Sequence, residues 1–280
     1  MSASGSSPPR VTAVVLGMHR SGTSVLAGML HRLGVNMGTG QRGDAWIGKH
    51  WSNPQGHFEN PRFVDLDRRI LGLGVSEIKV PPFWDQIAAR RTLFSAQVGR
   101  LVRTSEAPQW GFKDPWAVLA IEAYLPFLHK PRFVLCHRPA DEIARSMERR
   151  DGVPASETVG LVELFERRLS AFRADHPDFS YGSFELKSVN QDPMGTVRQL
   201  VKFLALEPNE AQERFAAALV LPEPELRREA RRLAARELGQ FYGYVGWLLR
   251  RDLPLGGGRV REDLFHSIPR EFVQTFKAAL

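Results

Sequence analysis

The chain has 280 residues, 43% of them hydrophobic and 25% charged, which is enough to bury a full core. Its single cysteine, Cys136, excludes an intrachain disulfide and favours a reducing, cytoplasmic location. The net charge of +7 is compatible with nucleic-acid binding and with plain solubility, so charge alone decides neither.

The first half of the chain predicts a strand, a loop and a helix before a less regular region. Residues 1–10, rich in Ser, Gly and Pro, are expected to be a disordered leader, and residues 11–280 a single domain. Residues 11–16 (VTAVVL) form a short β-branched apolar run, typical of a parallel strand covered on both faces. From Thr23 apolar residues recur at helical spacing until Gly34. A long loop is expected at 36–60, helices at 63–73, at 87–102 and up to Leu128, and a short strand at 110–113.

The second half repeats the strand-then-helix order. Residues 132–137 (RFVLCH) predict a buried strand, with Pro139 at the first position of the next helix. We then expect a helix at 159–172, a strand at 179–184 and a helix after Asp192-Pro193. This alternation predicts an α/β fold of the P-loop type, with a central, mainly parallel sheet between two helix layers.

A glycine-bounded loop, residues 17–24 (GMHRSGTS), lies between the first strand and the first helix. In such a loop, backbone N–H groups and the positive end of the helix converge on an anion. A P-loop NTPase has lysine after the second glycine, whereas this chain has Thr23 there and carries its cation inside the loop, at Arg20. We therefore expect a phosphosulfate donor that needs no magnesium; the alternative is a strand-turn-helix corner whose glycines serve packing.

The loop and its helix resemble the 5′-phosphosulfate-binding loop of sulfotransferases that use 3′-phosphoadenylyl sulfate (PAPS). The resemblance, to the bacterial-type members, spans roughly residues 11–205 and implies the P-loop sulfotransferase fold, PAPS as cosubstrate and sulfuryl transfer to a hydroxyl or amine. Sulfotransferases typically hold the 3′-phosphate with an arginine at a strand end and a serine eight residues later, which Arg138 and Ser146 match. The loop residues implied in donor binding are Gly17, Arg20, Ser21, Gly22, Thr23 and Ser24.

Three residues are candidates for catalysis: Glu59, Lys113 and Arg20. Glu59 lies in the segment 53–60 (NPQGHFEN), which resembles one that many bacterial-type sulfotransferases carry, and a carboxylate there can take the acceptor proton. His57 is the competing base, but the segment where cytosolic small-molecule sulfotransferases place their histidine reads Lys-Asp-Pro here, from Lys113. The resemblance brings Lys113 to the leaving oxygen, where a fixed cation stabilises growing charge. A surface pair of Lys113 with Asp114 is the alternative.

The acceptor is left open among carbohydrates, lipids and small molecules. No spacing of His, Cys and carboxylates predicts a metal site, and no run approaches the roughly 20 apolar residues of a membrane span. Nucleic acid is not an expected partner. The alternatives to PAPS chemistry are a P-loop kinase-like phosphotransferase, which should need Mg²⁺, and a non-catalytic basic nucleotide- or nucleic-acid-binding protein, whose affinity should fall steeply with salt.

Two basic segments near the end of the chain receive structural interpretations. The Arg-rich segment 226–238 is predicted to be a solvated helix with i,i+4 ion pairs, and a surface for an acidic partner is the alternative. Residues 256–261 (GGGRVR) are predicted to form a flexible surface loop rather than a lid over the 3′-phosphate.

Overall fold

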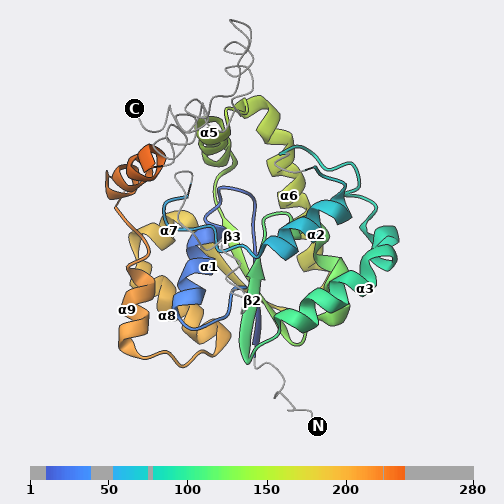
Figure 1. Cartoon of the computed structure of the whole chain (residues 1–280), viewed down its shortest axis with the longest axis horizontal. Coiled ribbons are helices and arrows are strands. Elements are labelled where there is room, and N and C mark those ends of the chain that lie inside the picture. The colour runs from blue at the N-terminus through green and yellow to red at the C-terminus, as the bar shows by residue number, and fades with distance from the viewer. Residues whose placement is uncertain (1–10, 39–52, 75–77, 223, 237–280) are drawn as a thin grey trace, which may run out of the picture. The chain divides into compact units, whose positions relative to one another are not determined.

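The structure is a computed structural model, and it describes residues 11–38, 53–74, 78–222 and 224–236 (Figure 1). These residues fall into two compact units. The first holds residues up to 38 and from 55 to 220, and with them the sheet and all candidate site residues. The second holds residues 53, 54, 221, 222 and 224–236. The expected leader lies outside the described residues, and the single domain over 11–280 stays a prediction.

Among the described residues, four parallel strands form the sheet of the first unit, in the order β2-β1-β3-β4. They are β1 (Val11–Leu16), β2 (Gln109–Lys113), β3 (Pro131–His137) and β4 (Ser180–Glu185). The four predicted strands and their parallel arrangement are confirmed. Since the strands run in one direction, the residues that follow their carboxyl ends share one edge of the sheet, where α/β folds bind ligands.

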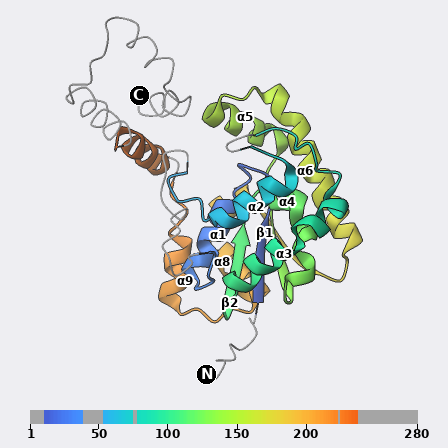
Figure 2. The same cartoon turned by 45° about the vertical axis from the view of Figure 1, so that its right-hand side comes forward.

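Helices cover both faces of this sheet (Figures 1 and 2). Alternate residues of β1 enter different cores: Val14 and Leu16 join one apolar cluster, Ala13 and Val15 the other. The first cluster is covered by α2 (Pro61–Leu71), α3 (Ile87–Ser105), α5 (Ala140–Asp151) and α6 (Ala155–Asp175). The second is covered by α1 (Thr23–Arg32), α7 (Leu186–Gln191), α8 (Pro193–Leu204) and α9 (Glu210–Ala217). The predicted three-layer α/β fold is therefore confirmed.

Local structure departs from the sequence prediction in three places. The helix expected to reach Leu128 is three short turns, α4 (Ala117–Ala120), η1 (Ile121–Ala123) and η2 (Leu125–Phe127). Pro126 has no N–H to continue a helix, and most of the stretch is buried, without a polar face. Pro139 is the N-cap of α5, with a non-helical ψ of 137°, and not its first helical residue. Finally, α9 begins at a capping box between Asn209 and Gln212 that the prediction omitted.

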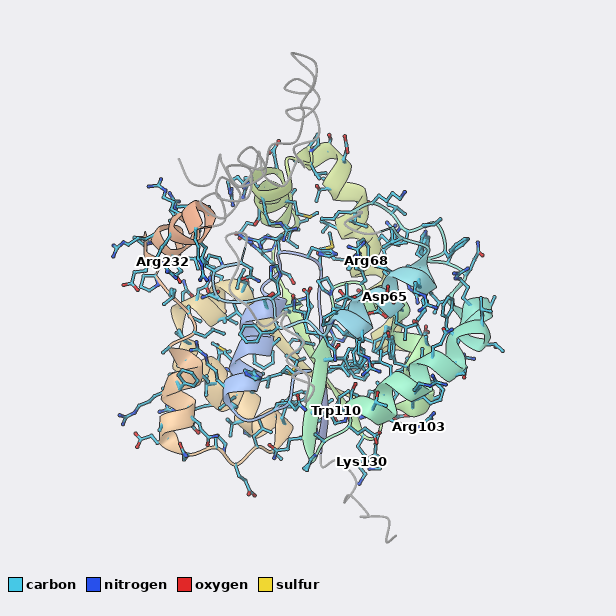
Figure 3. All side chains as sticks on the ribbon, viewed as in Figure 1. Asp65, Arg68, Arg103, Trp110, Lys130 and Arg232 are labelled. Carbon is cyan, nitrogen blue, oxygen red and sulfur yellow. The ribbon has the colours of Figure 1, made fainter. Side chains whose placement is uncertain are left out.

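The second unit contains a helix at residues 224–236, as predicted for the Arg-rich segment. Leu233 and Ala234 are buried, whereas Arg232, labelled in Figure 3, is exposed and pairs with Glu229 at i,i+3 spacing. The expected i,i+4 pairs stay a prediction. Residues 237 and 238 and the segment 256–261 lie outside the described residues. None of the helices in the described part of the chain is long and apolar enough to cross a bilayer.

Candidate active site

The loop between β1 and α1 is closed by its own hydrogen bonds. The Ser21 hydroxyl donates to the Met18 carbonyl oxygen over 2.7 Å, and the Ser21 N–H donates to the same oxygen over 3.1 Å. Arg20 and Gly22 have φ angles of 66° and 103°, in the left-handed region. Turns that include such residues point successive N–H groups to one side, which makes a concave site for an anion.

The residues that flank this loop are closely fitted to it. A β-carbon on Gly17 would lie 2.7 Å from the Cys136 carbonyl oxygen and 2.8 Å from Ser21 Oγ, so only glycine fits there. After the loop, α1 begins at Thr23, and no side chain of the described residues caps its first turn. Thr23 is buried and Ser24 half-buried. Both residues lie in the first turn of α1, at the positive end of the helix dipole.

The predicted residues of the two anion sites contact each other directly. Arg138 Nη1 donates to the Arg20 carbonyl oxygen over 2.9 Å, across a sequence separation of 118 residues. Arg20 Nε donates to Ser146 Oγ over 3.1 Å. Arg138 Nε also pairs with Glu142 over 3.0 Å, one turn into α5. Hydrogen bonds therefore join the loop after β1 to the residues that follow β3, with Arg20 and Arg138 side by side.

A cavity of about 390 Å³ opens at the carboxyl ends of β3 and β4. Its size lies in the range of small-molecule sites. Burial lowers the pKa of His137 in its wall, and the charge of Arg173 acts in the same direction, so this imidazole is mostly neutral at pH 7. The lining residues are His137, Arg138, Pro139, Ser183, Phe184 and Glu185. The cavity thus adjoins the predicted 3′-phosphate arginine.

Glu59 and Lys113, two of the catalytic candidates, form an ion pair between Lys113 Nζ and Glu59 Oε1. The Lys113 side chain is 1% exposed and the Glu59 side chain 14%, so both charges are largely removed from water. Lys113 ends β2 beside Val15 of β1, and Glu59 precedes Asn60, whose side chain caps α2. Buried charges persist only when they are paired, so each of the two holds the other in place.

A group of acids that sequence reasoning missed lies next to this ion pair. Asp67 of α2 is fully buried and accepts a 2.6 Å hydrogen bond from the Tyr124 hydroxyl. Asp114 is also buried, as is Lys113, so the two do not form the surface pair considered from sequence; Asp114 Oδ1 accepts a 3.3 Å hydrogen bond from the Trp116 N–H. Burial raises the pKa of Asp67 well above its usual value, and burial together with the nearby Glu59 charge raises the pKa of Asp114 to about 6. The missed signal is a charged residue on the apolar stripe of α2.

Histidines near the loop differ in their surroundings. His19 lies edge-on to Trp116, with ring centroids 4.8 Å apart, and also faces Phe165. Burial lowers its pKa well below 6.5, and the charge of Arg150 adds to this, so the ring is neutral. His57, the alternative base, is half-buried.

Within the ranges that the structure describes, no three His, Cys, Asp or Glu side chains are placed to hold a metal ion.

Comparison with known proteins assigns a family to this site. The model of the sulfotransferase family matches residues 13–210, well over half of the sequence. The chain belongs to the sulfotransferase family. The matched region of this sulfotransferase includes the loop after β1, the Glu59–Lys113 pair and the Arg138–Ser146 region, and it ends before the Arg-rich helix. No curated protein sequence gives a significant match.

Three solved structures are similar to this sulfotransferase. Sulfotransferase STF1 from Mycobacterium tuberculosis H37Rv is 16% identical, over 79% of this chain and 76% of that one, with a TM-score of 0.44. Sulfotransferase STF9 from Mycobacterium avium is 17% identical, over 76% and 68%, with a TM-score of 0.48. The sulfotransferase domain of the Synechococcus PCC 7002 olefin synthase is 15% identical, over 74% and 78%, with a TM-score of 0.47. Identities this low do not transfer a substrate.

Proposed function

We propose that this sulfotransferase moves a sulfuryl group from PAPS to a hydroxyl or amine of a carbohydrate, lipid or small-molecule acceptor. The observation that carries the proposal is the contact chain from Arg138 to the Arg20 carbonyl and from the Arg20 guanidinium to Ser146. PAPS has two anionic groups, the 5′-phosphosulfate and the 3′-phosphate. One guanidinium inside the anion loop and a second one at the next strand end are suited to such a pair.

The residues present fit PAPS better than ATP. The loop offers its N–H groups, the Thr23 and Ser24 positions at the helix start, and Arg20 as its cation. A kinase of this fold would use a lysine at position 23, where this chain has threonine. The cavity beside Arg138 has the size for a nucleoside next to the 3′-phosphate residues. The kinase alternative is therefore less well supported.

In the proposed reaction, Glu59 takes the proton of the acceptor as the acceptor oxygen or nitrogen attacks sulfur. A bond from sulfur to the acceptor forms, and the bond from sulfur to the bridging phosphate oxygen breaks. The electron pair of that bond stays on the departing oxygen, where Lys113 and Arg20 stabilise the charge. The products are the sulfated acceptor and 3′-phosphoadenosine 5′-phosphate (PAP), with the acceptor proton on Glu59.

The Glu59–Lys113 contact connects the two halves of this reaction. Before transfer, the ammonium of Lys113 holds the Glu59 carboxylate in position. Once Glu59 gains the acceptor proton it is neutral, and its attraction for Lys113 is largely lost. The ammonium is then available for the negative charge that has appeared on the leaving oxygen. Base and cation therefore act in sequence through one contact.

Calorimetric titration with PAP tests the donor without knowledge of the acceptor. We expect PAP to bind without Mg²⁺ and more tightly than Mg·ATP, and Arg138→Ala to weaken PAP binding by on the order of 10- to 100-fold. Arg145→Ala is the matched control, because Arg145 is on α5, the helix that follows Arg138, but is 57% exposed and pairs with Asp141. Preference for Mg·ATP, or no PAP binding, would show that the proposal is wrong.

A further inference from the structure

Phe58, which immediately precedes the proposed base Glu59, has an unusual backbone conformation. Its φ angle of 52° lies in the left-handed region, which is uncommon for residues other than glycine and exceptional for a bulky side chain. Residues 56–60 belong to no helix or strand, so regular backbone hydrogen bonding does not impose this conformation. Strain of this kind persists only where the surrounding contacts fix it, and such residues gather at functional sites.

The Phe58 ring is anchored on α1. Phe58 is 4% exposed and belongs to the apolar cluster that α1 covers. A β-carbon on Gly28, in the middle of α1, would lie 2.6 Å from Phe58 Cε2 and 2.9 Å from Cζ, so the ring fills the space that glycine leaves. The ring of His31, further along α1, is tilted by 45° to that of Phe58, with centroids 5.9 Å apart. The helix that starts at the anion loop therefore also holds Phe58.

Hydrogen bonds fix the chain on both sides of Phe58. Gln55 Nε2 donates to the Leu219 carbonyl oxygen over 2.6 Å, just after α9. On the other side, the Asn60 side chain accepts a 3.0 Å hydrogen bond from the N–H of Arg62 and caps α2. Glu59 lies between these fixed points, and its carboxylate pairs with Lys113 at the end of β2. The direction of the Glu59 side chain thus depends on the turn at the residue before it.

We propose that Phe58 is the positioning residue of the base, because its ring, docked on Gly28 of α1, holds the left-handed turn that directs the Glu59 carboxylate to Lys113. This inference rests on the proposed function for the role of Glu59. The first turn of α1 belongs to the proposed donor site, so an anchor on α1 fixes the base relative to the donor. Such precision matters, since a misplacement of about 1 Å can cost on the order of 10²-fold in rate.

Three substitutions separate the anchor from the strain. Phe58→Gly adopts the left-handed φ without strain but removes the ring, so any loss comes from the missing anchor. Phe58→Leu keeps an apolar side chain without the outer ring atoms, and it is measured as well in case the glycine variant does not fold. Gly28→Ala pushes the ring away from α1 without weakening the helix, because alanine is the better helix former. Phe172→Leu is the control, because this ring is 1% exposed but packs on Phe133 in the other apolar cluster.

Thermal unfolding tests the positioning without donor or acceptor. Lys113→Met leaves the Glu59 carboxylate buried without its partner only while Phe58 keeps it there. In the Phe58→Gly background Glu59 can turn to water, so Lys113→Met should lower the melting temperature by at most about half as much as in the wild type. In the Phe172→Leu background the decrease should equal that of the wild type. Equal decreases in the wild type, Phe58→Gly and Phe58→Leu would show that Phe58 does not position Glu59.

Release of PAP from PAPS, with water as the acceptor, tests the consequence for turnover. Phe58→Gly and Gly28→Ala should each reduce kcat by about 10-fold or more, while PAP affinity stays within about twofold, because the anion loop is unchanged. Phe172→Leu should keep the kcat of the wild type. Unchanged kcat in both Phe58→Gly and Gly28→Ala would overturn the role assigned to the ring.

The double variant Gly28→Ala/Phe58→Leu tests whether the ring itself transmits the effect. The leucine lacks the outer ring atoms that the new β-carbon would meet, so kcat should recover by about threefold or more relative to Gly28→Ala. No recovery would assign the effect to Leu219, whose side chain also borders Gly28, and would contradict the proposal. Failure of the wild type to bind PAP would refute the proposed function, whereas the melting temperatures would still decide whether Phe58 positions Glu59.

Discussion

Replacement of Lys113 by methionine isolates the energy of its ion pair with Glu59. Methionine keeps an unbranched stem but removes the ammonium, so Glu59 is left at 14% exposure without its partner. Loss of one member of a buried pair typically costs about 3–5 kcal/mol. Because Glu59 keeps some contact with water, we expect the lower end, about 3 kcal/mol. For a chain of this size about 1 kcal/mol corresponds to 2–4 °C, so the melting temperature should fall by about 6–12 °C.

The double variant Glu59→Gln/Lys113→Met completes a thermodynamic cycle. It leaves no unpaired charge from this contact, so we expect it to be about 2 kcal/mol more stable than Lys113→Met. It should not recover turnover, because it lacks both the proposed base and the proposed cation. Thermal unfolding and PAP release from PAPS measure the two effects separately.

Arg145→Met is the reference for a pair in open solvent. Arg145 and Asp141 are 57% and 62% exposed, so breaking their contact should cost no more than about 0.5 kcal/mol. If Lys113→Met unfolded at the same temperature as Arg145→Met, burial would not increase the stability cost of breaking the Lys113–Glu59 contact. If the double variant were no more stable than Lys113→Met, the uncompensated Glu59 charge would not be the cause of the loss.

Two further substitutions test the base and the loop. Glu59→Gln should reduce turnover by roughly 10²–10⁴-fold while calorimetry shows PAP affinity unchanged; full activity would shift the role of base to His57. Gly17→Ala should weaken PAP binding by about tenfold or more, because its β-carbon would meet the Cys136 carbonyl oxygen at 2.7 Å and displace the loop. Gly160→Ala, with nothing within 4 Å of the new β-carbon, is its control, and equal affinities would contradict the steric argument.

The strands could be predicted because each one is a local pattern. β1 reads as a continuous apolar run because its two faces enter different cores, with Val14 on one side and Val15 on the other. The short turns after β2, from α4 to η2, could not be predicted in the same way. Residues 117–121 are all buried, so the apolar pattern shows neither which side of a helix faces the core nor where the helix ends. The proline at 126 then interrupts the helical stretch. The start of α9 could have been predicted, because Asn209 and Gln212 have the spacing of a capping box.

The members of the candidate site came from motifs, but their contacts did not. Nothing local in the sequence states that the Arg20 carbonyl receives Arg138, because that contact depends on β3 lying beside β1. Asp67 was missed for a related reason. It lies on the apolar stripe of α2 with Phe63 and Ile70, where a carboxyl group has to find a buried partner. Which partner it finds, here the Tyr124 hydroxyl, is decided by tertiary packing.

The strand order β2-β1-β3 separates the proposed roles in space. It puts the anion loop between Lys113, at the end of β2, and Arg138, just after β3. A donor that spans this edge with its sulfuryl group toward β2 has its 3′-phosphate toward β3. Changes at Glu59 and Lys113 should then act on kcat, and changes at Arg138 on donor affinity. The reverse pattern, with affinity lost at β2 and turnover lost at β3, would require the donor to bind in the opposite direction, with its 3′-phosphate beside Lys113.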